Sequence, residues 1–306
     1  MNARTTDSIY RAFILLFLFF VPFVAGVSAN PLQSEVLQAV PGEVLTIGYQ
    51  GPLEAIELID QAGQSIGRYR SFRTNSSTVG QGRLRVLIPL SSHMDPGEYE
   101  LRFHTAAGSG PENRQLEIIR REFRSETIPL NYSLSELRSS DDPQKYEQAL
   151  AIQKVYATFN ADQVLWGANL RIPLPGKGSG KYRITSHYGD RRIFSYSDGS
   201  TARSIHSGID FAAAVGTPVL AAGRGRVVLA AASIISGYSV VIEHLPGVYT
   251  VYFHLDQLTV KRGQLVDSGQ RIGTVGMSGL ATGPHLHWEV RVHGVAVDPA
   301  MLTQIE

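Results

Sequence analysis

The sequence predicts a mainly β protein with an N-terminal β-sandwich domain, a helical connector and a C-terminal antiparallel β domain. Short segments rich in Val, Ile, Leu, Tyr and Phe alternate with Gly- and Pro-containing turns over most of the 306 residues. One stretch after residue 142 has instead the start signals and apolar spacing of a helix. Gly turns between short apolar segments favour antiparallel strands over alternating strands and helices.

The first 29 residues have the composition of a secretory signal peptide. Basic residues precede an apolar run from Ala12 to Val27, and small side chains at 27–29 suit cleavage before Asn30. The alternative, an uncleaved membrane anchor, is less favoured because the run is short for a spanning helix and contains Pro22. We therefore expect a periplasmic location, with an extracellular one as the alternative, and membrane contact only if the segment stays attached. The chain has no Cys, which excludes disulfides and a lipoprotein anchor.

Residues 34–122 are expected to form a β-sandwich of immunoglobulin-like type. Turn signals such as Pro41-Gly42 and Asp95-Pro96-Gly97 separate short apolar segments at the spacing of such domains. The six expected strands are Val44–Tyr49, Ala55–Ile59, Ser65–Tyr69, Leu84–Ile88, Tyr99–Phe103 and Gln115–Ile119. No catalytic constellation appears among them, so a spacer and a binding or autoinhibitory module are both open.

Residues 123–180 are expected to form a linker that contains one helix. Asp142 suits the N-cap and Pro143 the first turn, so the helix should run from there to about Asn160. An apolar stripe should pack it on one domain; its members are Tyr146, Leu150, Val155, Tyr156 and Phe159.

Charge and glycine patterns exclude nucleic acid as a partner. The totals are 28 Lys+Arg and 27 Asp+Glu, a net charge of +1, which offers no electrostatic capture of a polyanion. No phosphate-binding Gly-x-x-x-x-Gly-Lys-Ser/Thr loop is present. We interpret Gly223-Arg224-Gly225-Arg226 as a tight turn between two strands.

The most informative residues are three imidazoles and a carboxylate near the C-terminus. His206-Ser-Gly-Ile-Asp210 comes first, and His285-Leu-His287 lies well downstream. In a strand, His285 and His287 share one face, while Leu286, Trp288 and Val290 face a core. If 206–210 is extended, His206 and Asp210 also share a face. Three such ligands with an open fourth position for an attacking water are what a catalytic zinc ion needs.

The ordered motifs from Ile184 to Pro299 resemble the M23 peptidase family, the LytM or lysostaphin-like zinc endopeptidases of bacterial cell walls. The matching segments are Thr185–Arg191, His206–Phe211, Gly216–Val219, Ala221–Val227, Tyr252–Leu255, Val266–Gly273 and Thr282–Glu289. The resemblance implies an antiparallel LytM-type peptidase domain, placed here at 181–306, with an open groove.

The resemblance also implies a role for each of five residues. His206, Asp210 and His287 would be the zinc ligands, and His285 the general base. His254 would stabilise or orient the oxyanion and could share in the proton transfer. Histidine is the common base near neutral pH because its pKa suits proton transfer there. The polar segment 192–203 could not be matched to substrate-binding residues.

The remaining histidines are expected to serve other purposes. His187 should lie in a loop, His244 in a turn at a strand end, and His293 in a solvated hairpin turn. His93 and His104 lie in the N-terminal region and have no ligand partners in sequence.

The expected function is that of a secreted zinc-dependent endopeptidase that hydrolyses peptide cross-links of peptidoglycan. Which bond is cleaved stays open, although fold-level analogy favours D-Ala to diaminopimelate over a glycine bridge. One alternative is a non-catalytic LytM-type regulator of a cell-wall amidase, and another is a structural zinc domain. A protein regulator of unknown identity is also possible. Because the N-terminal domain or linker could cover the groove, we expect a 181–306 fragment to be at least as active as the mature chain.

Overall fold

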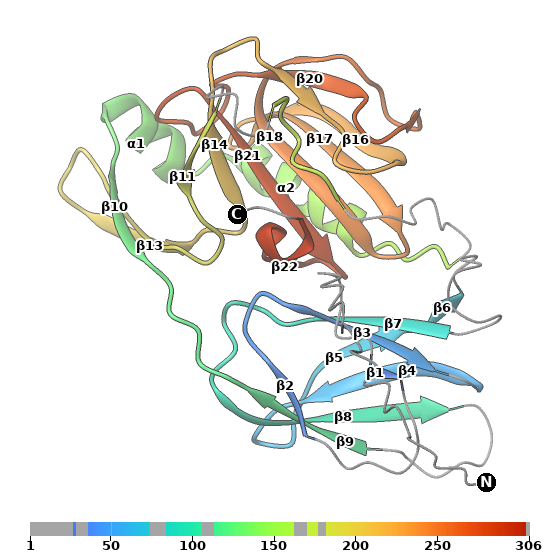
Figure 1. The fold of residues 1–306 in the computed structure, drawn as a ribbon. Helices are drawn as coiled ribbons and strands as arrows, with labels where there is room; N and C mark the ends of the chain where they lie inside the picture. The colour runs from blue at the N-terminus through green and yellow to red at the C-terminus, as the bar shows by residue number, and fades with distance from the viewer. Residues whose placement is uncertain are drawn as a thin grey trace, which may run out of the picture.

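A computed structural model describes residues 27–28, 36–49, 51–73, 84–105, 113–161, 170–176 and 182–303 (Figure 1). The predicted signal peptide, 1–29, lies outside these residues apart from the two-residue strand β1 (Val27–Ser28). Neither helix in the described ranges is long and apolar enough to cross a membrane. The protein is mainly β, as predicted, with the two helices between two β domains.

The N-terminal domain consists of two sheets that pack face to face as a sandwich. One sheet has the order β1, β3 (Val44–Tyr49), β7 (Leu84–Pro89), β6 (Phe72–Arg73). The other has the order β2 (Leu37–Ala39), β9 (Asn113–Ile118), β8 (Gly97–Thr105), β4 (Leu53–Ile59), β5 (Ser65–Arg70). Each of the six expected strands is present. Side chains from both sheets, such as Val86 and Leu101, share one apolar core, which is the sandwich arrangement.

The connector contains more structure than the sequence predicted. It begins with strand β10 (Ser125–Pro129) and helix α1 (Tyr132–Ser139), neither of which was expected. The predicted helix is α2 (Pro143–Tyr156), and the Asp142 side chain caps it by accepting from the Gln144 amide at 2.9 Å. It ends four residues before Asn160.

The predicted apolar stripe on α2 is wrong in its first half. Tyr146 is 69% exposed and Leu150 is 40% exposed. The helix packs on the C-terminal domain through its last turns, where Tyr156 joins Tyr249 and Val251 in a small apolar cluster. Only the C-terminal end of α2 reaches the sheet surface deeply, so the earlier apolar residues stay in solvent.

The C-terminal domain is built on a ten-stranded antiparallel sheet. Its main order is β11 (Arg183–Ser186), β14 (Ile209–Ala212), β21 (His285–Val292), β18 (Val248–Leu258), β17 (Gly237–Leu245), β16 (Gly225–Ser233), β19 (Leu265–Val266). Three strands branch from it: β15 (Pro218–Leu220), β20 (Arg271–Val275) and β22 (Val295–Val297), and a 3-10 turn, Pro299–Leu302, comes last. The Gly223–Arg226 segment links β15 to β16, but these two strands pair with other partners and form no hairpin.

A smaller sheet stands beside this domain and includes a strand from the connector. Its order is β10, β12 (Arg191–Ser195), β13 (Thr201–Ile205). β10 runs parallel to β12 over five residue pairs, from Ser125 opposite Arg191 to Pro129 opposite Ser195. The chain therefore leaves the sandwich and immediately adds an edge to the C-terminal domain (Figure 1).

Polar and aromatic contacts join the two domains. The Arg121 guanidinium donates to Asp298 at 2.5 Å, and the Tyr188 hydroxyl accepts from the Ser92 amide at 3.1 Å. His293 lies in the turn between β21 and β22, but the expectation that it is solvated is wrong. Its ring packs against the rings of Tyr69 and Phe159, with centroids at 5.4 and 5.5 Å. Burial lowers the pKa of His293 to about 4, so it is neutral near pH 7.

Candidate metal centre and groove

Strand register places the predicted metal ligands together. β14 and β21 are adjacent, with Asp210 directly opposite His287. Trp288 and Leu286 on the alternate positions of β21 are fully buried in the core, so His287 faces the other side, as the strand period predicted.

His206 reaches the same point from a bend rather than from an extended segment. β13 ends at Ile205 and β14 begins at Ile209, so 206–210 is not the continuous strand that the sequence suggested. A Cβ on Gly208 would collide with the Trp288 carbonyl, so glycine allows this bend to lie close over β21. The His206 amide donates to the Asp190 carbonyl at 2.9 Å, which fixes the residue at the start of the bend.

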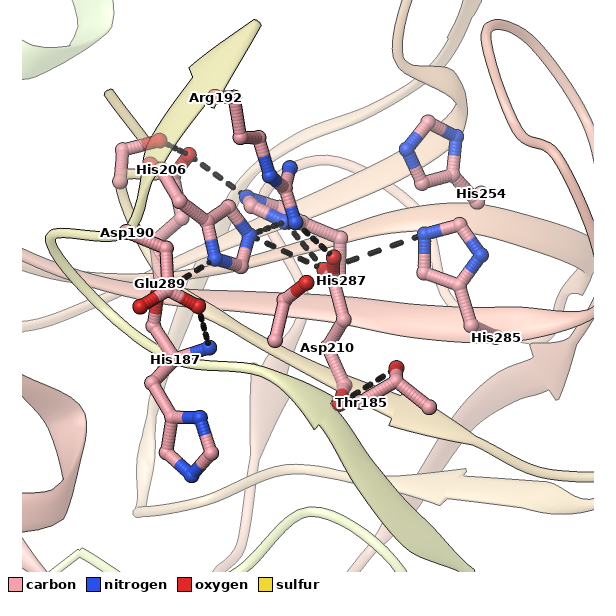
Figure 2. Close-up of polar contacts among 12 residues, drawn as sticks. Thr185, His187, Asp190, Arg192, His206, Asp210, His254, His285, His287 and Glu289 are labelled. Atoms are coloured by element: carbon pink, nitrogen blue, oxygen red, sulfur yellow. Dashed lines mark hydrogen bonds and ion pairs between the residues drawn. The ribbon is translucent and has the colours of Figure 1, made fainter. Parts of the chain in front are cut away.

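Three donor atoms converge at this point (Figure 2). His206 Nε2 lies 3.0 Å from His287 Nδ1, and Asp210 Oδ1 lies 3.2 and 2.8 Å from these two nitrogens. The three residues are buried, and their ligand atoms all lie within 4.8 Å of one another. Two imidazole nitrogens and a carboxylate oxygen with an open side are the donor set of a catalytic zinc site, so the residues present fit a zinc ion.

Hydrogen bonds behind the ligands fix the orientation of each ring. His206 Nδ1 donates to the His187 carbonyl at 2.8 Å, and His287 Nε2 donates to Glu289 Oε1 at 2.9 Å. When each ring is neutral, the nitrogen that faces the centre carries the lone pair that a metal needs. Burial alone would lower the pKa of His287, but Asp210 and Glu289 raise it to about 9, so a metal ion would displace a proton from this ring. Sequence reasoning assigned no role to Glu289, although its position two residues after His287 on the same strand face was the available signal.

The carboxylate ligand is held by an arginine that the sequence did not identify. Arg192 Nη2 donates to Asp210 Oδ2 at 2.6 Å, and Arg192 Nε donates to Glu126 Oε1 at 2.7 Å. Arg192 lies at the start of the segment that could not be interpreted, and Glu126 lies on β10 of the connector. Oδ2 is thereby occupied, which leaves Oδ1 toward the two imidazoles. Nothing in the sequence placed β10 beside β12.

Electrostatics in the centre favour ionised carboxylates. Burial alone would raise the pKa of Asp210, but His206 and His287 hold it well below its usual range. Burial would likewise raise the pKa of Glu289, which Arg291 and His287 lower strongly. The pKa of His206 is lowered, chiefly by burial, which favours the neutral ring that a metal ligand requires.

His285 and His254 form a second pair beside the centre. Their ring centroids are 4.8 Å apart, and His285 Nε2 lies 3.9 Å from Asp210 Oδ1. His285 Nδ1 donates to the Gly283 carbonyl and His254 Nδ1 donates to the Ser278 carbonyl, each at 2.8 Å. Each neutral ring thus has an unprotonated Nε2. Burial and the charges of His285 and His287 lower the pKa of His254 to about 3.

His254 reaches this position through an unusual backbone conformation. In β18, Tyr252 is buried in the core, while the ring of Phe253 stacks on that of His287 at 5.6 Å. Regular alternation would turn His254 back toward the core. Its φ of 61° lies in the left-handed region, which is uncommon for a residue other than glycine, and the side chain lies beside His285 instead (Figure 2).

The five residues line a groove of about 490 Å³. One wall comes from β10, α1 and β12, with Ile128, Arg138 and Phe194 among its residues. Ile235 and Leu280 also line the groove. A groove of this kind, with polar groups on its floor and apolar groups on its walls, suits an extended peptide.

The other histidines lie outside the centre. The His187 ring is in a loop, as predicted, and only its backbone takes part in the site. The prediction for His244 is wrong: it is fully buried within β17, where its ring contacts the Arg224 carbonyl and the Thr250 hydroxyl at 2.8 and 2.7 Å. His104 pairs with Glu57, and His93 contacts Ser91, both on the sandwich.

Fold and site together define a metallopeptidase-type domain, and comparison with known proteins finds a family model that matches it. Residues 204–299 match the model of peptidase family M23. This match lies in the C-terminal domain and agrees with the resemblance that the motifs carry.

Two relatives and one solved structure illustrate the likeness. The chain is 44% identical over 119 residues to the peptidoglycan DD-endopeptidase ShyA of Vibrio cholerae, which is 39% of this chain and 27% of ShyA. It is 43% identical over 95 residues to the DD-carboxypeptidase/endopeptidase Mpg of Neisseria meningitidis, 31% of this chain and 22% of Mpg. These matches thus span about a quarter of the curated relatives. A Pseudomonas aeruginosa crystal structure described as a peptidase M23 superposes with a TM-score of 0.56 and 25% identity, over 86% of this chain and 93% of that one.

Proposed function

We propose that this protein is a secreted zinc-dependent endopeptidase that hydrolyses peptide cross-links of peptidoglycan in the periplasm. The observation that carries the proposal is the convergence of His206, Asp210 and His287 on one point, with His254 and His285 beside it. The match to family M23 and relatives named as peptidoglycan endopeptidases support the substrate. The export step rests on the composition of residues 1–29.

A zinc ion held by the three ligands would supply a Lewis acid that polarises a peptide carbonyl and makes water a usable nucleophile near neutral pH. His285 Nε2 has no proton in the neutral ring, because Nδ1 donates to the Gly283 carbonyl. It is therefore the group placed to take a proton from the attacking water and pass it to the leaving amine.

His254 supports the same reaction from the other side of His285. Its low pKa keeps the ring neutral, so Nε2 is available as an acceptor beside His285. It can therefore accept a hydrogen bond from the water and orient it beside His285, whereas contact with the reacting carbonyl would require a proton on Nε2. The Arg192–Asp210 and Glu289–His287 contacts keep the ligand geometry fixed during this step.

The alternatives receive less support. Loss of ligands would suit a non-catalytic regulator of an amidase, whereas this chain retains all five expected side chains at the groove. A structural zinc site normally has four protein ligands. Within the described ranges, the group that could hold a metal has three members.

The test is digestion of purified peptidoglycan by the mature, zinc-loaded chain, with mass spectrometry of the released muropeptides. We expect cross-linked dimers to disappear, with the mass of the products naming the bond. A chelator and His285→Ala should each abolish the loss. If dimers persist with zinc-loaded protein while an added wall amidase is stimulated, the endopeptidase proposal fails and the regulator is supported.

A further inference from the structure

One wall of the groove comes from a segment outside the residues that match family M23. β10 and α1 precede residue 204, where that match begins, and they contribute Ile128, Leu130 and Arg138 to the groove lining. α1 is fixed by its cap, where Asn131 accepts from the Leu134 amide at 2.9 Å. The Ser135 hydroxyl accepts from the Ser197 amide at 3.0 Å, which ties the helix to the small sheet. This wall is therefore a built part of the site.

Arg138 is the cation of this wall. Its guanidinium carbon lies 4.0 Å from the centroid of the Phe194 ring, and its Nε donates to the Tyr196 hydroxyl at 3.1 Å. Stacking on Phe194 and the bond to Tyr196 hold the side chain in place without neutralising it. The guanidinium is thus pre-positioned, with its terminal nitrogens available for a planar acceptor.

The carboxylates of the groove already have cationic partners. Asp210 and Glu126 share Arg192, and Glu289 accepts from Arg291 at 2.6 Å. Arg138, in contrast, has no carboxylate within ion-pair distance in the described part of the chain. Among the described residues of the groove lining, Arg138 is therefore the arginine without a carboxylate partner, and the apolar side chains of Ile128, Leu130 and Phe194 line the same groove.

We propose that Arg138 forms a subsite for a free carboxylate on the peptide substrate, so that the enzyme selects acidic stem peptides. A guanidinium binds a carboxylate through two parallel N–H donors, which gives orientation as well as affinity. Ile128 and Leu130 then contact the aliphatic part of the same peptide residue. The proposal rests on the proposed function in taking a cross-linked peptide as the ligand.

The experiment measures binding separately from cleavage. The probes are two fluorescein-labelled cross-linked stem-peptide dimers, one with free diaminopimelate carboxyls and one with those carboxyls as carboxamides. Fluorescence anisotropy is recorded with the zinc-loaded full chain carrying His285→Ala, which prevents turnover. We expect the acid form to bind roughly tenfold more tightly than the amide form, a difference typical of one charge-assisted contact.

Variants at Arg138 then assign the difference to this residue. In the same background, Arg138→Gln should bind both dimers equally, and Arg138→Lys should keep part of the preference. The matched control is Arg114→Gln, which removes a guanidinium stacked on Phe103 of the sandwich, 5.6 Å from its centroid, and should change nothing. Unfolding midpoints verify that each variant is folded.

The proposal is overturned if the dimers bind equally to the Arg138 protein, or if Arg138→Gln keeps the preference. Cleavage by the protein with His285 intact separates this result from the proposed function. A preference for the acid dimer without cleavage of either dimer would support the subsite and remove the endopeptidase. Cleavage of both dimers without a preference would support the endopeptidase and overturn the subsite.

Discussion

The two β domains differ in what they bury. In the described part of the sandwich, Ser92 is the only buried polar side chain, and hydrophobic side chains make up the core. The C-terminal domain buries a set of ionisable groups; these are Asp190, His206, Asp210, Glu243, His244, His254, His287, Glu289 and Asp298. Burial of such groups is costly unless each has partners.

The difference shows which residues stabilise the fold and which carry the proposed reaction. Behind β21, the fully buried Leu286, Trp288 and Tyr252 belong to the large apolar core of the C-terminal domain. On the other face of the same strand lie His285, His287 and Glu289. One strand thus supplies the packing that stabilises the domain and the polar groups that carry the reaction, whereas the sandwich has only the first of these.

The strongest test of this difference between the domains is to remove one histidine from each of them. His287→Ala should lose the metal and at least about 10⁴-fold of peptidoglycan hydrolysis, because one of three ligands is gone. His104→Ala, on the sandwich, should leave both unchanged, since its ring pairs with Glu57, far in sequence from the metal ligands. Metal content per chain and muropeptide release check the pair. Zinc retained at full occupancy in His287→Ala would contradict the assigned ligand set.

The catalytic pair can be separated from the metal ligands in the same way. His285→Ala should lower the rate by roughly 10²–10⁴-fold, the usual contribution of a general base, while the zinc content stays at the original level. Its Nε2 lies 3.9 Å from Asp210 Oδ1, beside the ligands rather than among them. Rate and zinc are measured on the same preparation. Unaltered hydrolysis in this variant would assign the role of general base to His254 instead.

Glu289 tests the support behind the ligands. Glu289→Gln should weaken zinc binding by about 10–100-fold, because the charged acceptor of the His287 Nε2 proton is replaced by an amide. Competition with a chromogenic chelator measures the affinity. Glu117→Gln is the matched control, since Glu117 accepts from Gln38 on an exposed edge of the sandwich. Equal affinity in both variants would show that the ring of His287 needs no such acceptor.

The connector argues against one expectation drawn from the sequence. A 181–306 fragment lacks β10, α1 and the Glu126 carboxylate that accepts from Arg192, so one groove wall is missing. We therefore expect this fragment to be several-fold less active than a 120–306 fragment, although the sequence suggested activity at least equal to that of the mature chain. The specific activities of both fragments test this expectation, and circular dichroism verifies that each fragment is folded. A fully active 181–306 fragment would show that the wall is dispensable.

Local periodicity and ordered motifs account for the part of the structure that the sequence could predict. The facing of His285 and His287 against Leu286 and Trp288 is a period-2 argument, and the structure confirms it. The six sandwich strands were long enough to carry an apolar pattern, whereas β6 has two residues and carries none.

The features that the sequence could not predict depend on non-local contacts or on backbone geometry. β10 itself carries no apolar run, and it pairs with β12, which lies more than sixty residues downstream. Arg192 and Glu126 acquire a role only through that pairing. The position of His254 depends on its φ of 61°, which no residue spacing encodes.

The smallest expected effect concerns pH, and it sharpens the contrast between the domains. Burial lowers the pKa of His244 to about 4, from an ordinary value near 6.5. Between pH 6.5 and pH 4, this histidine is therefore protonated in the unfolded chain but neutral in the folded chain. The free energy of unfolding consequently falls as the pH falls below about 6.5. At pH 5.5 the loss from this residue is about 1.4 kcal/mol. The sandwich, with no buried histidine in its described residues, should show no such step.

Unfolding monitored by the fluorescence of Trp288, which is fully buried in the C-terminal domain, measures this effect in the C-terminal half. Between pH 7.5 and 5.5 we expect the free energy of unfolding of that half to fall, and His244→Asn to remove the part due to His244. The Asn side chain can still donate to the Arg224 carbonyl or accept from the Thr250 hydroxyl, so the variant keeps one of the two polar contacts. If His244→Asn loses stability with acid as steeply as the natural chain, the pH dependence belongs to other groups, of which His293 at the domain contact is the first to replace.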